Sequence, residues 1–79
     1  MELDTFIKQL ADAVEGLDAS TLTGDTPLAA LPQWDSLALL TTLAMVDSEY
    51  GVQVSGRALQ ECQTVGDLFR LVQKHLPPS

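Results

Sequence analysis

The sequence has few basic residues and few cysteines, and each shortage excludes a class of protein. Only 4 lysines and arginines stand against 11 acidic residues, and the net charge of −7 opposes binding to nucleic acid phosphates. The one cysteine, Cys62, cannot form an internal disulfide and leaves no cysteine pair for a zinc site. A chain of 79 residues forms one small core and has no room for a large substrate cleft.

Targeting and membrane signals are also missing. The start of the chain lacks the basic region and apolar stretch of a signal peptide, and no apolar run approaches the roughly 20 residues that cross a bilayer. We therefore expect a cytoplasmic protein that binds neither membranes nor nucleic acid. The acidic residues concentrate early, because residues 1–35 hold seven acids and one base, whereas residues 36–79 hold four acids and three bases.

The first half of the chain predicts one helix and a long loop. Apolar residues recur at three- and four-residue steps over residues 2–16, which is typical of an amphipathic helix that ends at Gly16. Residues 17–34 are rich in Ser, Thr and Gly and are broken by Pro27 and Pro32. Such a long loop is uncommon in a compact domain, so we expect its apolar residues to hold it against the core. These residues are Leu22, Leu28, Leu31 and Trp34.

The second half predicts three more helices. One covers residues 35–50 and stops at Gly51, a short one covers residues 55–62, and the last covers residues 64–76. Thr64 and Asp67 have the spacing of a capping box that opens the last helix, and two prolines, Pro77 and Pro78, end it. The predicted fold is all-α, a four-helix bundle with a long first loop and a short third helix.

The helix over residues 35–50 shows an unusual surface. If Leu40, Leu43, Val46 and Tyr50 face the core, the remaining sides are nearly uncharged. We interpret four residues on those sides as a partner-binding surface that acts mainly through apolar contacts: Leu37, Thr41, Ala44 and Met45. Such binding would depend little on salt. The alternative is that these side chains are half-buried or singly exposed and have no function.

Asp35 and Ser36 stand at the start of the same helix, where a serine can have three roles. Both residues are of the types that cap helices. A hydrolase would need a base beside Ser36, but the only histidine, His75, lies near the C-terminus and no Gly-x-Ser-x-Gly motif is present. The third role is attachment, because a phosphate on a hydroxyl at a helix N-terminus is stabilised by the unpaired N–H groups there.

The segment "LPQWDSLALLTTLAMVDSEYGVQVSGRALQECQTVGDLFRLV" resembles the acyl carrier and peptidyl carrier protein family. The likeness rests on Asp-Ser-Leu opening a helix, an aromatic-Gly pair at its end, and the Thr-Val-x-Asp-Leu that follows. With the first helix and the Pro-containing loop, it covers nearly the whole chain. It implies that Ser36 carries 4′-phosphopantetheine, transferred from coenzyme A by a separate magnesium-dependent phosphopantetheinyl transferase.

The resemblance further implies a carrier that catalyses nothing itself. Its arm would hold a thioester, supplied by an acyl- or aminoacyl-loading enzyme and used by the synthase or transferase enzymes of one pathway. Asp35 and Arg57 would add polar contacts to such partners. The nearly uncharged helix and Trp34 before Asp-Ser-Leu look more like discrete carriers of specialised pathways, or peptidyl-type carriers, than fatty acid carriers.

We expect a monomeric, stand-alone carrier, although an excised domain would show the same features. Whether the cargo is a fatty acyl, polyketide or aminoacyl group stays open. The competing hypothesis is a small acidic interaction module in which Ser36 only caps its helix.

Overall fold

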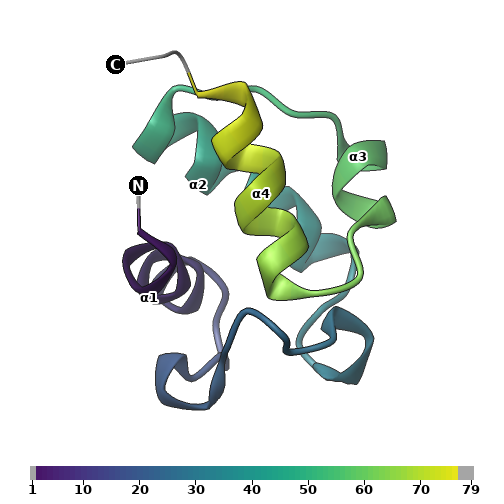
Figure 1. Cartoon of the computed structure of the whole chain (residues 1–79). Helices are drawn as coiled ribbons and strands as arrows, with labels where there is room; N and C mark the ends of the chain where they lie inside the picture. The colour runs from purple at the N-terminus through teal and green to yellow at the C-terminus, as the bar shows by residue number, and fades with distance from the viewer. Residues whose placement is uncertain (1, 77–79) are drawn as a thin grey trace.

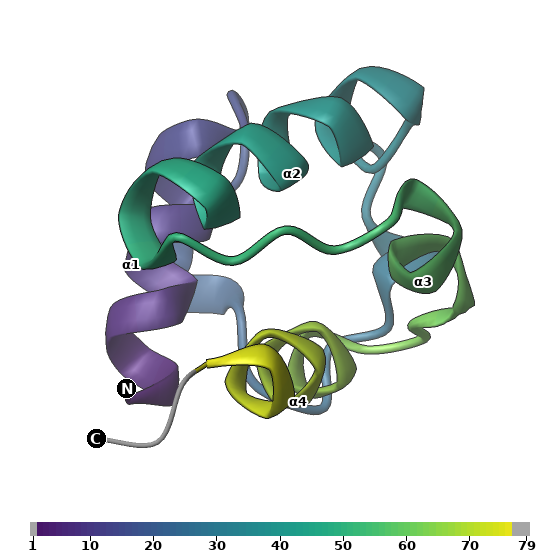
Figure 2. The same cartoon turned by 90° about the horizontal axis from the view of Figure 1, so that it is seen from above.

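The computed structural model describes residues 2–76. Within that range it contains four α-helices and no strand, which confirms the predicted all-α architecture. The helices surround a single apolar core, with α1 and α2 on one side and α3 and α4 on the other (Figures 1 and 2). Their bounds are Leu3–Ala13 for α1, Ser36–Tyr50 for α2, Gly56–Glu61 for α3 and Val65–His75 for α4.

The first helix, α1, ends earlier than its periodicity suggests. Its last residue is Ala13, because Val14 leaves the helical conformation and buries its side chain in the core. The chain then reverses through Gly16, whose φ of +91° lies in the left-handed region that favours glycine. Gly16 therefore forms the turn after α1, as expected, but the helix itself stops three residues before it.

Helices α1 and α4 each bury one side. Phe6 and Leu10 of α1 and Leu68 and Val72 of α4 have no exposed surface, and the rings of Phe6 and Phe69 lie 5.8 Å apart in an edge-on arrangement. The periodic apolar residues of both helices thus form the centre of the core, which is what their amphipathic patterns predict.

The long connection between α1 and α2 is held to the start of α4. The N–H of Gly66 donates to the carbonyl of Gly24 at 2.8 Å, and the N–H of Leu28 donates to the carbonyl of Gln63 at 2.8 Å. A Cβ on Gly66 would lie 2.8 Å from that same carbonyl oxygen, so this close approach needs glycine. Two 3₁₀ helices also lie in the connection, η1 (Ala19–Thr21) and η2 (Leu28–Ala30). Its expected anchors pack on the core, with Leu22 and Leu28 buried and Leu31 and Trp34 half-buried.

Side chains cap α3 and α4, and the cap of α4 is the capping box that the sequence predicts. Ser55 Oγ accepts from the N–H of Ala58 at 3.0 Å at the start of α3. At the start of α4, Thr64 Oγ1 accepts from the N–H of Asp67 at 3.1 Å, and the Asp67 carboxylate accepts from the N–H of Thr64 at 3.2 Å. The predicted stop at Pro77 and Pro78 lies outside the described residues.

The orientation of α2 differs from the expectation. Leu40, predicted to face the core, is 64% exposed, whereas Thr42 and Met45, predicted on the outer sides, are 0% and 8% exposed. Apolar residues occur around the whole helix, so several stripes fit a 3.6-residue period and the period cannot choose between them. The structure buries Ala38 and Thr42, and the Thr42 hydroxyl donates to the Ala38 carbonyl at 2.8 Å, so this buried hydroxyl is not left unpaired.

This orientation removes Met45 from the predicted partner-binding surface. Its side chain belongs to the core cluster, together with Val46 in the next position. The prediction for Met45 was wrong because it followed from the stripe that placed Leu40 inside.

Candidate functional site

Ser36 is the first residue of α2 and is exposed. The cap of this helix is Asp35, whose Oδ1 accepts from the N–H of Ala38 at 2.9 Å. Within residues 2–76 the Ser36 hydroxyl has no hydrogen-bond partner. Because Asp35 performs the capping, the Ser36 side chain is available for another role.

The backbone around Ser36 offers donors to an anion. Neither the N–H of Ser36 nor that of Leu37 meets an acceptor in the described part of the chain, because the first α-helical bond of α2 runs from Leu39 to Asp35 at 3.0 Å. The helix is 15 residues long, and Asp47 is the first acid within it. Asp35 at the N-cap accepts from the N–H of Ala38, which leaves the N–H groups of Ser36 and Leu37 at the positive end of the dipole. A phosphate esterified to the Ser36 hydroxyl fits this donor set.

A side-chain bond holds the approach to Ser36 in place. Gln33 Nε2 donates to the carbonyl of Gly16 at 3.0 Å, joining the turn after α1 to the segment just before α2. The Gln33 side chain packs so closely there that a Cβ on Gly16 would lie 2.9 Å from Gln33 Cγ. This tie was not predicted, because it joins residues 17 positions apart and neither residue type signals it.

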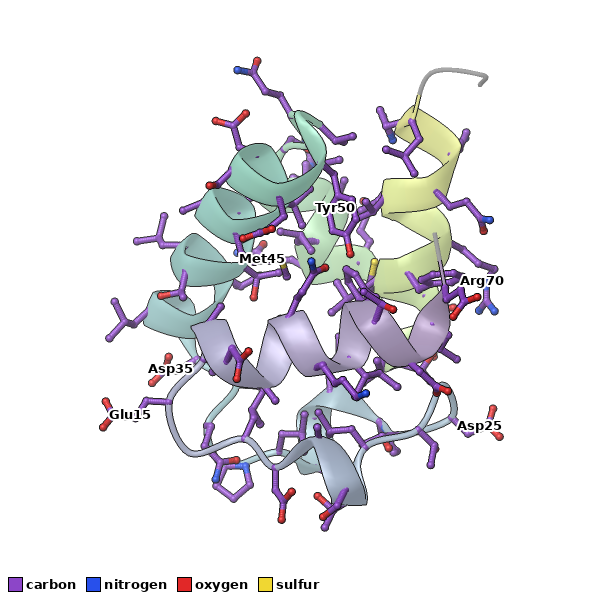
Figure 3. The ribbon with its side chains drawn as sticks, turned by 90° about the vertical axis from the view of Figure 1, so that its left-hand side faces the viewer. Glu15, Asp25, Asp35, Met45, Tyr50 and Arg70 are labelled. Carbon is purple, nitrogen blue, oxygen red and sulfur yellow. The ribbon has the colours of Figure 1, made fainter. Side chains whose placement is uncertain are left out.

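A groove of about 450 Å³ runs between the end of α1 and the start of α2. Asp35 and Leu37, the two residues that flank Ser36 in the chain, both line it. Figure 3 shows Glu15 and Asp35 at the same edge of the molecule, where the two helices meet the intervening connection. The groove is also lined by Val14, Glu15, Gln33, Ala38 and Thr41.

The other predicted partner-binding residues are accessible. Leu37 is 71% exposed, Asp35, Ala44 and Arg57 are exposed, and Thr41 is half-buried. Leu40, which the sequence placed in the core, has the same outward orientation as Leu37, since the two are three positions apart on one helix. Leu37, Leu40 and Ala44 therefore form one exposed stripe, called here the apolar face of α2.

The described residues do not support a hydrolase site, a reactive thiol or a metal site. His75 is exposed, its Nδ1 lies 2.9 Å from the Leu71 carbonyl of its own helix, and no hydrogen bond joins it to Ser36. Burial raises the pKa of the half-buried Cys62 thiol, helped by the nearby charges of Asp67 and Glu61, so little of it is the reactive thiolate at neutral pH. Within residues 2–76 no cluster of His, Cys, Asp and Glu suits a metal ion, and no helix has the length and apolar character to cross a membrane.

Comparison with known proteins agrees with this geometry. Residues 5–72 match the family model described as the phosphopantetheine attachment site. An acyl carrier protein of Thermotoga maritima is 31% identical over 95% of this chain and 93% of its own length. The chain belongs to the acyl carrier protein family.

Two further relatives widen the comparison. An acyl carrier protein of Rhodococcus erythropolis is 29% identical over 92% of this chain and 80% of its own length. The oxytetracycline polyketide synthase acyl carrier protein of Streptomyces rimosus is 31% identical over 95% of this chain and 78% of its own length. These relatives confirm the predictions of a carrier rather than an enzyme and of a covalently attached 4′-phosphopantetheine. As a family member, the carrier interacts with a phosphopantetheinyl transferase and with synthase enzymes.

Proposed function

We propose that Ser36 is the attachment residue of this carrier. The observation that supports it most is that Asp35, not Ser36, accepts the capping hydrogen bond at the start of α2. The Ser36 hydroxyl is exposed and has no hydrogen-bond partner within residues 2–76. In the reaction, Ser36 Oγ loses its proton and forms a bond to the phosphorus of 4′-phosphopantetheine. The bond between that phosphorus and the 3′,5′-ADP portion of coenzyme A breaks as this bond forms.

Three parts of the chain would support this reaction and its product. The unpaired N–H groups of Ser36 and Leu37 would lie beside the phosphodiester, where the helix dipole favours negative charge. Asp35 holds the first turn of α2 in shape, and the Gln33 bond to Gly16 fixes the segment leading to it. When attached, the prosthetic group supplies a thiol that holds the cargo as a thioester.

Partner enzymes of the pathway would dock on the apolar face of α2, with Asp35, Thr41 and Arg57 at its edges. Leu37 and Leu40 expose 71% and 64% of their surface, so they add little to the stability of the fold. Adjacent exposed leucines are typical of a surface that binds a partner. Binding through this face would change little with salt, because Leu37, Leu40 and Ala44 carry no charge and charged residues lie only at its edges. A steep loss of binding with ionic strength would instead assign docking to the acidic residues of α1 and the connection.

The cargo that we propose is an acyl intermediate of a specialised pathway, with a polyketide chain as the leading candidate. The supporting observations are the similarity to the carrier of oxytetracycline polyketide synthase and the uncharged first turns of α2. An aminoacyl cargo is the alternative that Trp34 before Asp-Ser-Leu keeps open. We further propose that the carrier acts as a monomer in the cytoplasm, which light scattering and cell fractionation would test.

The attachment proposal is tested by treating the apo protein with coenzyme A, Mg²⁺ and a broad-specificity phosphopantetheinyl transferase, followed by intact-mass measurement. The wild type should gain one phosphopantetheine mass, whereas Ser36→Ala should gain none. Ser48→Ala is the matched control, because Ser48 is another exposed serine of α2 and its loss should leave modification unchanged. Modification of a folded Ser36→Ala protein would overturn the assignment, and no gain by the wild type beside a working control carrier would favour the interaction module.

A further inference from the structure

We propose that the groove between the end of α1 and the start of α2 receives a basic side chain of the phosphopantetheinyl transferase, an arginine or a lysine, and that Glu15 is a docking residue for it. The proposal rests on the proposed function, because it concerns the enzyme that acts at Ser36. It goes beyond docking on the apolar face of α2, because the groove shares Leu37 with that face but extends to Val14 and Glu15 after α1.

The shape and polarity of the groove fit a long cationic side chain. Its floor includes the buried side chains of Val14 and Ala38, while its rim carries the exposed carboxylates of Glu15 and Asp35. An arginine or lysine has an apolar stem that packs on such a floor and a charged end that reaches such a rim. The planar guanidinium of arginine has several donors and can hydrogen-bond to a carboxylate through two of them at once.

Neither acid of the groove, Glu15 or Asp35, forms an ion pair within residues 2–76. The one ion pair among residues 2–76 joins Arg70 to Asp67 on α4, and no lysine or arginine lines the groove. Glu15 makes no hydrogen bond in the described part of the chain. Glu15 is therefore unpaired at the rim, and Asp35 forms no ion pair although its Oδ1 accepts from the N–H of Ala38. The two carboxylates give the groove a negative potential that a cationic partner can neutralise.

The position of the groove selects the transferase as that partner. An enzyme that forms a bond to Ser36 Oγ must bring its reacting atoms to the start of α2, and it must therefore cover Asp35 and Leu37, which line the groove. Enzymes that use the cargo meet a thiol at the far end of the arm and need not approach the end of α1. Gln33 keeps the groove in shape, because its bond to Gly16 fixes one wall.

The test compares two variants that each remove one negative charge from α1 or the turn after it. Glu15→Gln removes a charge from the groove, and Asp12→Asn removes one from an exposed site that does not line it. With the transferase and saturating coenzyme A, Glu15→Gln should raise KM for the carrier about two- to fivefold at low salt with kcat unchanged, which is the range expected for one partly exposed ion pair. Asp12→Asn should change KM by less than about 1.5-fold, because a solvent-exposed charge outside the contact is screened.

Two further measurements complete the design. The ratio between the KM values of Glu15→Gln and the wild type should shrink as salt is raised, because screening removes the same interaction. Thr41→Arg places a cation in the groove from within, and it should raise KM more than Glu15→Gln does while circular dichroism reports an unchanged helical fold. Equal KM values for Glu15→Gln and Asp12→Asn would overturn the proposal, even with Ser36 fully modified, whereas a wild type that is not modified at all would reject the attachment proposal instead.

Discussion

Helices α1 and α4 divide their residues into a buried apolar side and an exposed polar side, whereas α2 exposes leucines on one side while it buries Ala38 and Thr42 on the other. In α1 and α4 the largest apolar side chains are in the core, among them Phe6, Leu10 and Leu68. In α2 two leucines point to solvent and a threonine takes a fully buried place. The large apolar side chains of α1 and α4 thus pack in the core, whereas α2 packs on the core with one side and exposes leucines on another.

This difference indicates which residues of α2 are not explained by packing in the core. Ala38 and Thr42 are small and buried, and the Thr42 hydroxyl donates to the Ala38 carbonyl within its own helix. Leu37 and Leu40 add nothing comparable to the core. Placing apolar residues outside and a polar one inside is the kind of local conflict that marks a functional surface.

The largest expected effect is a difference in stability between a buried and an exposed leucine. Leu68→Ala should lower the free energy of unfolding by about 2–5 kcal/mol, because it opens a cavity in the core, whereas Leu40→Ala should change it by less than about 0.5 kcal/mol. Urea unfolding followed by circular dichroism measures both. A large loss from Leu40→Ala would erase the distinction between α2 and the other helices.

The next effect concerns binding. Leu37→Ala or Leu40→Ala should raise the transferase KM for the carrier roughly fivefold or more, equivalent to about 1 kcal/mol, because a leucine covered by a partner loses its apolar contact. Raising the salt should leave this ratio unchanged, unlike the ratio for Glu15→Gln. Wild-type kinetics in both leucine variants would show that the apolar face is not part of this contact.

The capping assignment predicts a smaller effect at two adjacent residues. Asp35→Ala should lower the free energy of unfolding by about 1 kcal/mol, because the N–H of Ala38 loses its acceptor. Ser36→Ala should change it by less than about 0.5 kcal/mol, since its hydroxyl has no partner in the described structure. Thermal unfolding of the two apo variants makes the comparison, and a reversed order of stability would assign the cap to Ser36.

The smallest predicted effect lies at α4, where Asp67 is part of the capping box. Hydrogen bonds from the N–H of Gln63, from Arg70 and from the N–H of Thr64 lower the pKa of Asp67 below its usual 3.8. A lowered folded-state pKa stabilises the fold above the unfolded-state value, and this stabilisation is lost as pH falls through the folded-state pKa. Asp67→Asn should therefore be less stable than the wild type at pH 7, with the gap closing below about pH 4.

A control separates this effect from general acid denaturation. Asp12→Asn changes an exposed carboxylate of α1 that has no hydrogen bond within residues 2–76, so its stability should stay close to that of the wild type at pH 7. Melting temperatures between pH 7 and pH 3 test the pair. If the melting temperatures of Asp67→Asn and the wild type fell in parallel as pH was lowered, the Asp67 carboxylate would not contribute the predicted pH-dependent stability.

Features that depend on neighbouring residues could be predicted from the sequence. Asp35, Thr64 and Asp67 act on N–H groups within three positions, and Gly51 ends α2 with a φ of +64°. The pattern of α1 also identified its buried side, because polar residues fill the other sides. The proposal that Ser36 is the attachment residue comes from the family resemblance, which rests on Asp-Ser-Leu at a helix start after a long loop.

Features that depend on distant residues could not be predicted. The rotation of α2 about its axis, which buries Ala38 and Thr42, depends on packing against the other helices. A helix that is apolar on all sides gives no periodic signal for this rotation. Met45 was misplaced for this reason. The bond from Gln33 to Gly16, and with it the groove that holds Glu15, needs the folded connection to bring its two ends together.

The most direct test of the account is to identify the modified residue. The wild-type protein is co-expressed with a phosphopantetheinyl transferase, digested, and each serine-containing peptide is sequenced by tandem mass spectrometry. The account predicts the phosphopantetheine mass on Ser36 alone, with the other serines of α2 and the connection unmodified. A modified residue other than Ser36 would contradict it.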